Sequence, residues 1–107
     1  MTTVSVQEYY DSYIISVAGH AGFDEVGKDI VCAAISALTY TMINALKWAE
    51  DENCLYIRAE SVDDGSVYLE VLPYDFSREK IDTIIETCII GYSLIEEDYP
   101  DYITVSG

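Results

Sequence analysis

The chain has 107 residues, a length typical of a single domain, and half of them are hydrophobic. That apolar content excludes a disordered tail, because enough surface can be buried to offset the chain entropy lost on folding. Five Lys and Arg against twenty Asp and Glu give a net charge of −15. This charge disfavours binding to nucleic acid or to an anionic membrane, and favours a basic protein or peptide as partner.

In chain order, the residue pattern predicts two strands, a helix, two strands, a second helix and a last strand. The first two strands are expected over residues 2–6 and 12–18. The loop over residues 19–28 contains three glycines, which is typical of an irregular and mobile segment. The later elements are expected as a helix from its cap Asp29 to about Glu50, strands over 54–61 and 67–72, a helix over 77–98 and a strand over 102–105.

Turn chemistry and apolar stripes indicate how these elements pack. The run Asp63-Asp64-Gly65-Ser66 predicts a β-hairpin between the third and fourth strands. On the second helix, the apolar stripe comprises Ile81, Ile84, Ile85, Cys88, Ile89, Tyr92 and Ile95. On the first helix, the expected packing face comprises Ile30, Ala33, Ala34, Ala37, Leu38, Thr41, Ala45 and Ala49.

The predicted fold is a single α+β domain over residues 1–107, in the order β-β-α-β-β-α-β. We expect one mixed or antiparallel sheet with two helices packed on it. Because so short a chain cannot enclose a large cavity, any active site is expected to be a surface groove.

The stretch that carries chemistry begins at the end of the second strand. His20 stands there, and Cys32 follows in the first turn of the predicted helix. A helix N-terminus has unpaired N–H groups and a partial positive charge, which stabilise a thiolate over a thiol. If the loop folds back, the two side chains form a nucleophile and its general base. The alternative is that Cys32 is a buried small hydrophobe among Val31, Ala33 and Ala34.

Two neighbours of Cys32 also have two interpretations each. Asp29 either caps the helix or orients His20, and the cap is favoured because it needs no special geometry. Ser36, one turn after Cys32, either forms a hydrogen bond near the thiolate or bonds back to the Cys32 carbonyl.

The remaining cysteines, Cys54 and Cys88, are expected to pack in the core. An odd number of separated cysteines and a single histidine argue against disulfides and structural zinc, so no metal is expected. The N-terminus lacks the regions of a signal peptide, and no stretch approaches the roughly 18 uninterrupted apolar residues of a membrane span. An intracellular, cytoplasmic location is therefore expected.

Two segments together carry a family resemblance. The run Gly19-His20-Ala21, followed by residues 27–36, resembles the signature of the ribosomal-processing cysteine protease family, Prp. The similarity continues through Asn44-Ala45, the second hairpin, Ser93-Leu94 and Tyr99, and so extends over essentially the whole chain.

The resemblance implies a small, homodimeric, cytoplasmic bacterial endopeptidase with an α+β fold and no cofactor. Members of the family remove a short N-terminal extension from large-subunit ribosomal protein number twenty-seven. The implied nucleophile is Cys32 and the implied catalytic histidine is His20. Gly19, Asp29 and Ser36 are implied as supporting residues. The loop that contains Gly22 and Gly27 is implied to be a mobile lid that orders over the substrate.

Acyl transfer by such a pair requires an oxyanion hole. The backbone N–H groups near Val31 to Ala33 are our hypothesis for its donors. Two other functions remain open from the residues. A non-enzymatic acidic adaptor for a basic ribosomal protein would not need Cys32. A redox-sensing thiol protein would need Cys54 or Cys88 as resolving cysteine, and both are expected to be buried.

Overall fold

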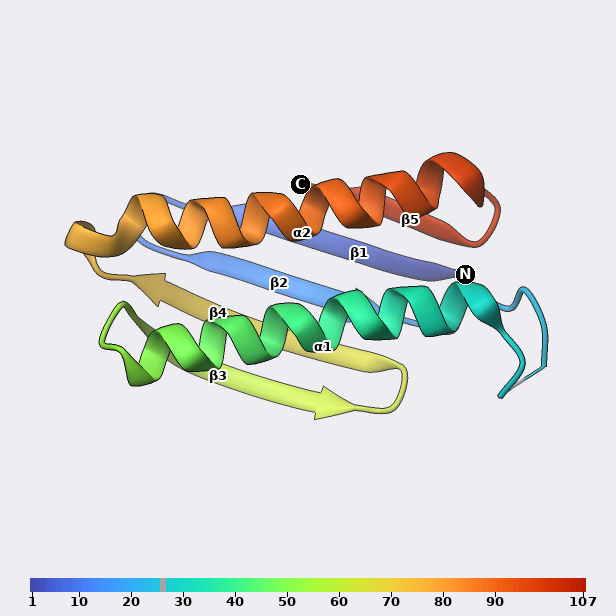
Figure 1. Cartoon of the computed structure of the whole chain (residues 1–107), viewed down its shortest axis with the longest axis horizontal. Helices are drawn as coiled ribbons and strands as arrows, with labels where there is room; N and C mark the ends of the chain where they lie inside the picture. Colours follow the sequence, from blue (N-terminus) through green and yellow to red (C-terminus); the bar gives the residue numbers. More distant parts are fainter. Residues whose placement is uncertain (26) are drawn as a thin grey trace.

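The computed structural model describes residues 1–25 and 27–107, and it confirms the predicted α+β class and element order (Figure 1). The termini of the elements differ from the expected ones by one or two residues. The elements are β1 (Thr2–Glu8), β2 (Tyr13–Ala18), α1 (Ile30–Asp51), β3 (Leu55–Asp63), β4 (Ser66–Pro73), a 3₁₀ turn η1 (Asp75–Ser77), α2 (Arg78–Asp98) and β5 (Ile103–Ser106).

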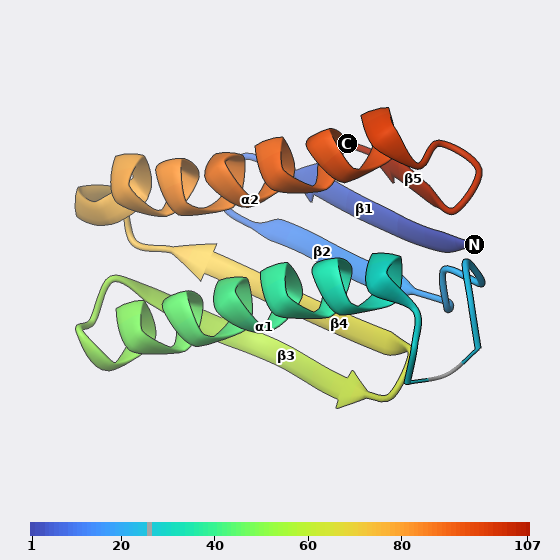
Figure 2. The same cartoon turned by 45° about the vertical axis from the view of Figure 1, so that its right-hand side comes forward.

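The five strands form one mixed sheet in the order β3-β4-β2-β1-β5. Neighbouring strands are antiparallel except β1 and β5, which are parallel. The connections β2–α1–β3 and β4–α2–β5 cross over the same face of the sheet, so both helices lie on that face (Figures 1 and 2). This topology brings the loop before α1, the β3–β4 turn and the α2–β5 turn to one end of the molecule.

The core lies between the sheet and the two helices. Along β4, residues alternate between buried and partly exposed, as expected for a sheet covered on one face. The predicted stripe on α2 is confirmed, because its members are buried or packed against the core. Tyr92 from this stripe is fully buried and shares a 2.6 Å hydrogen bond with Thr39 of α1.

The predicted packing face of α1 was wrong. The buried residues of this helix are Val31, Ile35, Thr39, Met42, Ile43, Leu46 and Ala49. Of the expected face only Ala49 is buried, and Ile30 is 58% exposed. The large apolar side chains decide the orientation, because burying Ile, Leu and Met removes more apolar surface from water than burying Ala. Ala33, Ala34 and Ala37 are therefore exposed.

Helix α1 is long and apolar enough, by length and composition alone, to cross a membrane. No other helix in the described part of the chain meets that test. Here one side of α1 packs on the sheet and on α2, as in a core helix.

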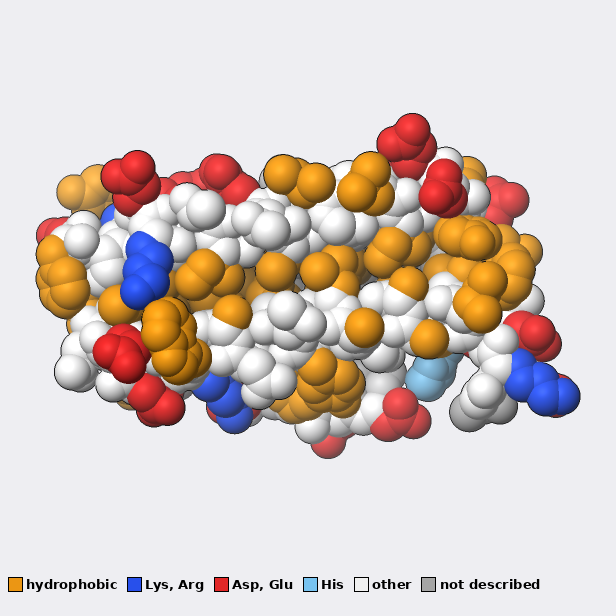
Figure 3. All heavy atoms as spheres, viewed as in Figure 1, with side chains coloured by type: hydrophobic (Ala, Val, Ile, Leu, Met, Phe, Trp, Pro, Cys, Tyr) orange, Lys and Arg blue, Asp and Glu red, His pale blue; other side chains and the backbone are white. Residues whose placement is uncertain are grey.

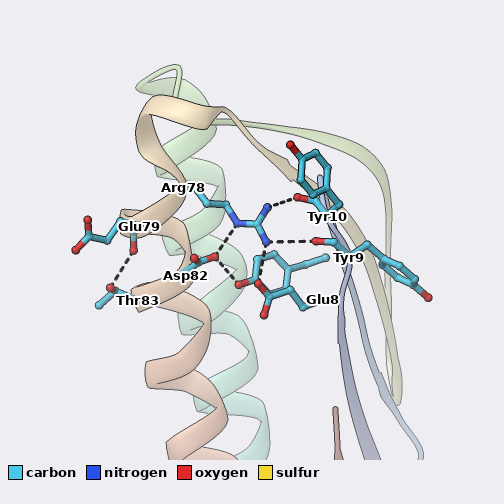
Figure 4. Close-up of polar contacts among 8 residues, drawn as sticks. Glu8, Tyr9, Tyr10, Arg78, Glu79, Asp82 and Thr83 are labelled. Carbon is cyan, nitrogen blue, oxygen red and sulfur yellow. Dashed lines mark hydrogen bonds and ion pairs between the residues drawn. The ribbon is translucent and has the colours of Figure 1, made fainter.

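A polar cluster around Arg78 fastens the end of the molecule opposite the loop before α1 (Figure 4). Its guanidinium donates to the Asp82 and Glu8 carboxylates and to the Tyr10 carbonyl, each at 2.9 Å. Tyr13 donates to the same Asp82 carboxylate. Although burial acts to raise the pKa of Asp82, the hydrogen bonds from Tyr13 and Arg78 bring it below its ordinary value. The cluster joins the β1–β2 turn to the start of α2.

Candidate active site

A cleft of about 700 Å³ opens at the end of the molecule where the loop before α1 meets the β3–β4 turn. It is open to solvent, as the expectation of a surface groove requires. The site residues implied by the sequence all line it, together with Thr2 of β1 and the β3–β4 turn: Gly19, His20, Gly22, Gly27, Asp29, Cys32 and Ser36. The structure thus brings the two halves of the sequence motif together.

Asp29 has the role of helix cap that the sequence favoured. Its Oδ1 accepts the backbone N–H of Cys32 at 2.9 Å. Its Oδ2 accepts the N–H groups of Phe23 at 2.9 Å and Asp24 at 3.3 Å. Burial acts to raise the pKa of this carboxyl, but the backbone hydrogen bonds together lower it below its ordinary value. Within the described residues, the Asp29 carboxylate makes no hydrogen bond to His20.

Cys32 lies in the first turn of α1, at the floor of the cleft. Its thiol is partly exposed, unlike those of Cys54 and Cys88, which are buried as predicted. Burial raises the pKa of the Cys88 thiol, which disfavours a reactive thiolate there. The Sγ of Cys32 accepts the backbone N–H of Ala21 at 3.3 Å. Cys32 is therefore the cysteine that combines access from solvent with a donor aimed at its sulfur.

His20 is exposed at the rim of the cleft, where the single histidine is visible below the start of α1 in Figure 3. Its ring lies against Gly65 of the β3–β4 turn. A Cβ atom at Gly65 would lie 2.8 Å from the Nε2 atom of His20, and Gly65 has a φ of +74°. Among the described residues, the imidazole forms no hydrogen bond with the Cys32 thiol.

Gly19 fixes the start of the loop. Its N–H donates to the Gly65 carbonyl at 2.8 Å, and its carbonyl accepts the Thr2 hydroxyl at 3.1 Å. With a φ of +92°, a Cβ here would also lie 2.5 Å from the Met1 carbonyl oxygen. Only glycine fits this position without strain. The supporting role expected for Gly19 is thus explained by backbone geometry.

The amides proposed as oxyanion donors are mostly occupied. The N–H of Cys32 donates to the Asp29 side chain, and the N–H of Ala33 donates to the Asp29 carbonyl at 3.0 Å. The hypothesis that the first-turn amides form the oxyanion hole stays a prediction, and it requires these two groups to change partner when the substrate binds. Ser36 is exposed beside the cleft, and its hydroxyl forms no hydrogen bond among the described residues, so the back-bonding interpretation is not supported.

Sequence reasoning missed the neighbours that the tertiary structure supplies. Asp63 and Asp64 line the cleft beside His20, although the sequence indicated only their turn. Phe23 contacts two aromatic rings, Tyr99 and Tyr102, from the turn between α2 and β5. An isolated phenylalanine in a glycine-containing loop is the signal that could have pointed to this contact.

Carboxylates dominate the charge of the cleft. Asp24, Glu25, Asp29, Asp63 and Asp64 all line it. The cleft therefore carries part of the chain's net charge of −15 and is suited to an incoming basic segment.

The fold and the cleft together define a class of protein. A partly exposed cysteine at a helix N-terminus, next to a loop that carries a histidine, is the arrangement of enzymes that use a thiol as nucleophile.

Comparisons with known proteins narrow the class. The family model for the cysteine protease Prp matches residues 1–104. The ribosomal processing cysteine protease Prp of Bacillus subtilis (strain 168) is 31% identical, with 99% of this chain and 96% of that protein covered. The protein of the same description from Staphylococcus aureus (strain Mu50 / ATCC 700699) is 29% identical, with 82% of this chain and 79% of that protein covered.

Solved structures agree. A crystal structure of an essential ribosomal processing protease Prp from S. aureus, in complex with a covalently linked product peptide, has a TM-score of 0.75 at 25% identity, covering 99% of this chain and 98% of that one. The crystal structure of SMU.848 from Streptococcus mutans has a TM-score of 0.70 at 27% identity, covering 99% and 92%. The chain belongs to the Prp family of ribosomal processing cysteine proteases. This membership favours the enzyme over the adaptor and the redox sensor.

Proposed function

We propose that this cysteine protease removes a short N-terminal extension from large-subunit ribosomal protein number twenty-seven, with Cys32 as nucleophile and His20 as its acid–base partner. The observation that carries the proposal is the cleft itself. Residues far apart in sequence converge there around one accessible thiol, which a backbone N–H contacts at 3.3 Å. The S. aureus relative that was crystallised with a covalently linked product peptide supports it.

The reaction is an acyl transfer in two steps. The Cys32 thiolate attacks the scissile carbonyl carbon and forms a C–S bond. The C–N bond then breaks, and the leaving amine takes a proton from the His20 imidazolium. In the second step His20 takes a proton from water, the resulting hydroxide attacks the acyl carbon, and the C–S bond breaks. The second product leaves with a new carboxylate, and Cys32 returns to its initial state.

This mechanism requires the imidazole to approach the thiol. The His20 side chain is exposed and rests against Gly65. It can therefore change rotamer without disturbing the packing of the core. Catalytic hydrogen bonds are often absent from enzymes without substrate and form in the substrate complex. We infer that an extended peptide in the cleft displaces His20 from the β3–β4 turn toward Cys32.

The electrostatics of the cleft fit this substrate class. Ribosomal proteins bind RNA and are basic, so their terminal segments are attracted to a cleft lined by carboxylates. Long-range attraction of this kind raises the rate of association and weakens as salt is added. A fall in kcat/KM with rising ionic strength, at constant kcat, is the expected signature.

We extend the proposal to a cytoplasmic homodimer. Apolar side chains such as Ile30, Ile90 and Leu94 are more than half exposed on the helical face, and a second copy would cover such residues. Sedimentation equilibrium is expected to give twice the monomer mass, and a concentration-independent monomer would contradict the dimer.

The decisive test is cleavage of a synthetic peptide that spans the extension and the first mature residues of the ribosomal protein. Products are identified by mass spectrometry. We expect one cut by the wild type and none by Cys32→Ser or His20→Ala. Cys54→Ala is the matched control, because it removes a cysteine that is buried outside the cleft. A cut by Cys32→Ser at the wild-type rate would contradict the assignment of the nucleophile.

A further inference from the structure

We propose that Phe23 is a positioning residue, which docks on Tyr99 and Tyr102 and thereby holds the Ala21 amide against the Cys32 sulfur. The role goes beyond the residues that the motif implies. Its catalytic meaning rests on the proposed function, because it assumes that Cys32 is the nucleophile.

The aromatic contact is specific in geometry. The Phe23 ring lies 5.4 Å from the Tyr99 ring and 5.2 Å from the Tyr102 ring, both at an interplanar angle of 81°. Edge-to-face pairs of this kind are favoured over random contact, beyond the area that they bury. Hydrophobic side chains gather at this end of the molecule, between the end of α2 and the start of α1 (Figure 3). The loop is thus tied to a part of the chain that follows it by more than seventy residues.

Backbone hydrogen bonds connect the two tyrosines to α2 and to β1. The N–H of Tyr99 donates to the last turn of α2, at the Ile95 carbonyl, and the N–H of Tyr102 donates to the Tyr99 carbonyl. The Tyr102 carbonyl accepts the N–H of Thr2, the first residue of β1, at 3.0 Å. A loop residue that packs on these two tyrosines is therefore held in position relative to the sheet and to α2, rather than relative to another loop.

A second anchor acts on the same residue. The backbone N–H of Phe23 donates to Asp29, whose other carboxylate oxygen accepts the N–H of Cys32. One carboxylate therefore joins the loop to the residue that carries the thiol. Phe23 is thus anchored twice: its side chain packs on Tyr99 and Tyr102, and its backbone N–H binds Asp29.

The anchored segment presents Ala21 to the sulfur. Gly19 is pinned to Gly65 on one side, and Phe23 is anchored on the other. Ala21, between them, is 2% exposed, and its N–H lies 3.3 Å from the Cys32 Sγ. A hydrogen bond to sulfur is stronger when the sulfur is charged, so the position of this donor matters most when Cys32 acts as a nucleophile. Gly22 separates Ala21 from Phe23 and provides little stiffness of its own, so the outer anchor controls where the donor points.

A purely structural role makes a different prediction. Phe23 is 39% exposed and lies outside the sheet and both helices, so its removal costs little packing in the core. If Phe23 served only stability, Phe23→Ala would lower the melting temperature and leave the chemistry of the folded thiol unchanged. If Phe23 positions Ala21, Phe23→Ala should change the reactivity of the Cys32 thiol and leave the melting temperature nearly unchanged.

The experiment compares wild type, Phe23→Ala and Phe23→Tyr in the full-length chain. Alkylation of Cys32 by iodoacetamide is followed by peptide mapping, at about pH 6 and about pH 9, below and above the usual titration range of a cysteine. The measured quantity is the ratio of the alkylation rate at the lower pH to the rate at the higher pH. In Phe23→Ala we expect this ratio to fall about tenfold, which is the effect of losing one hydrogen bond to a charged group. Phe23→Tyr keeps the ring and is expected to behave as the wild type. An unchanged ratio in Phe23→Ala would overturn the proposal.

Peptide cleavage by the same variants separates this inference from the proposed function. If Phe23 positions the donor, Phe23→Ala lowers kcat more than it raises KM, and Phe23→Tyr restores kcat. If the wild type alkylates as expected but cuts no peptide, the proposed function fails while the positioning role stands. If the wild type cuts and Phe23→Ala has the same kcat, the positioning role fails alone.

Discussion

The hydrogen bond between Tyr92 and Thr39 is the main polar link between the two helices, and the direction of its proton can be worked out. The Thr39 hydroxyl donates its only proton to the Ile35 carbonyl at 2.7 Å. In the 2.6 Å bond to Tyr92, the Thr39 oxygen must therefore accept, and the tyrosine hydroxyl must donate. Tyr92→Phe and Thr39→Val are consequently unequal perturbations.

Their costs follow from which group is left without a partner. Tyr92→Phe removes the donor, and Thr39 keeps its bond to Ile35, so the free energy of unfolding should fall by about 1 kcal/mol. Thr39→Val leaves the tyrosine hydroxyl buried without its acceptor, because Tyr92 is 0% exposed. That loss should cost about 2–3 kcal/mol. The double variant contains no orphaned hydroxyl and should be more stable than Thr39→Val alone.

Urea unfolding of the four proteins, fitted at constant m-value, measures this cycle. The expected result is a coupling free energy of about 2 kcal/mol between the two positions. If Tyr92→Phe destabilises the fold as much as Thr39→Val, or if the two effects simply add, the assigned proton direction is wrong.

Four further outcomes are expected. Burial raises the pKa of Tyr92 to about 12 from 10.0, so stability is fully present below about pH 10 and is lost as the pH rises toward 12. The loss should reach about 2–3 kcal/mol in alkaline urea titrations and be smaller in Tyr92→Phe. Asp29→Ala should slow both peptide cleavage and Cys32 alkylation, because it releases the loop and the first turn of α1 together. Gly19→Ala should lower the free energy of unfolding by about 2 kcal/mol or more, measured in urea, and an unaffected variant would show that the backbone relaxes there. Arg78→Lys should reduce stability by about 1–2 kcal/mol by calorimetry, yet leave kcat unchanged, because its cluster lies at the far end from the cleft.

The elements of this fold were predictable because their signals are local. The Asp63 to Ser66 run forms the expected hairpin turn, with Gly65 at positive φ. Asp29 caps α1 by accepting the Cys32 amide. This is the usual bond of an N-cap aspartate to the backbone N–H three residues later. The stripe on α2 was predicted correctly because its apolar residues recur at helical spacing along one face.

The orientation of α1 was not predictable in the same way. Its sequence contains a small-residue stripe and a large-residue stripe, both at helical spacing. Which of the two is buried depends on the space between the helix and the sheet. That space is filled by Val31, Ile35, Met42 and Leu46. A local pattern carries no information about the partner surface, and the competition is decided by the total area buried.

For the site, the sequence by itself determined the chemistry: a cysteine in the first turn of a capped helix, a histidine at a strand end, and a loop able to bend between them. The tertiary structure decided which residues surround this cysteine, this histidine and this loop. Strand order places β4 beside β2, so Gly65 meets His20, and the β4–α2–β5 crossover brings Tyr99 and Tyr102 to Phe23. These contacts join segments separated by tens of residues, and only the strand order of the sheet and the packing of both helices on one face bring them within reach.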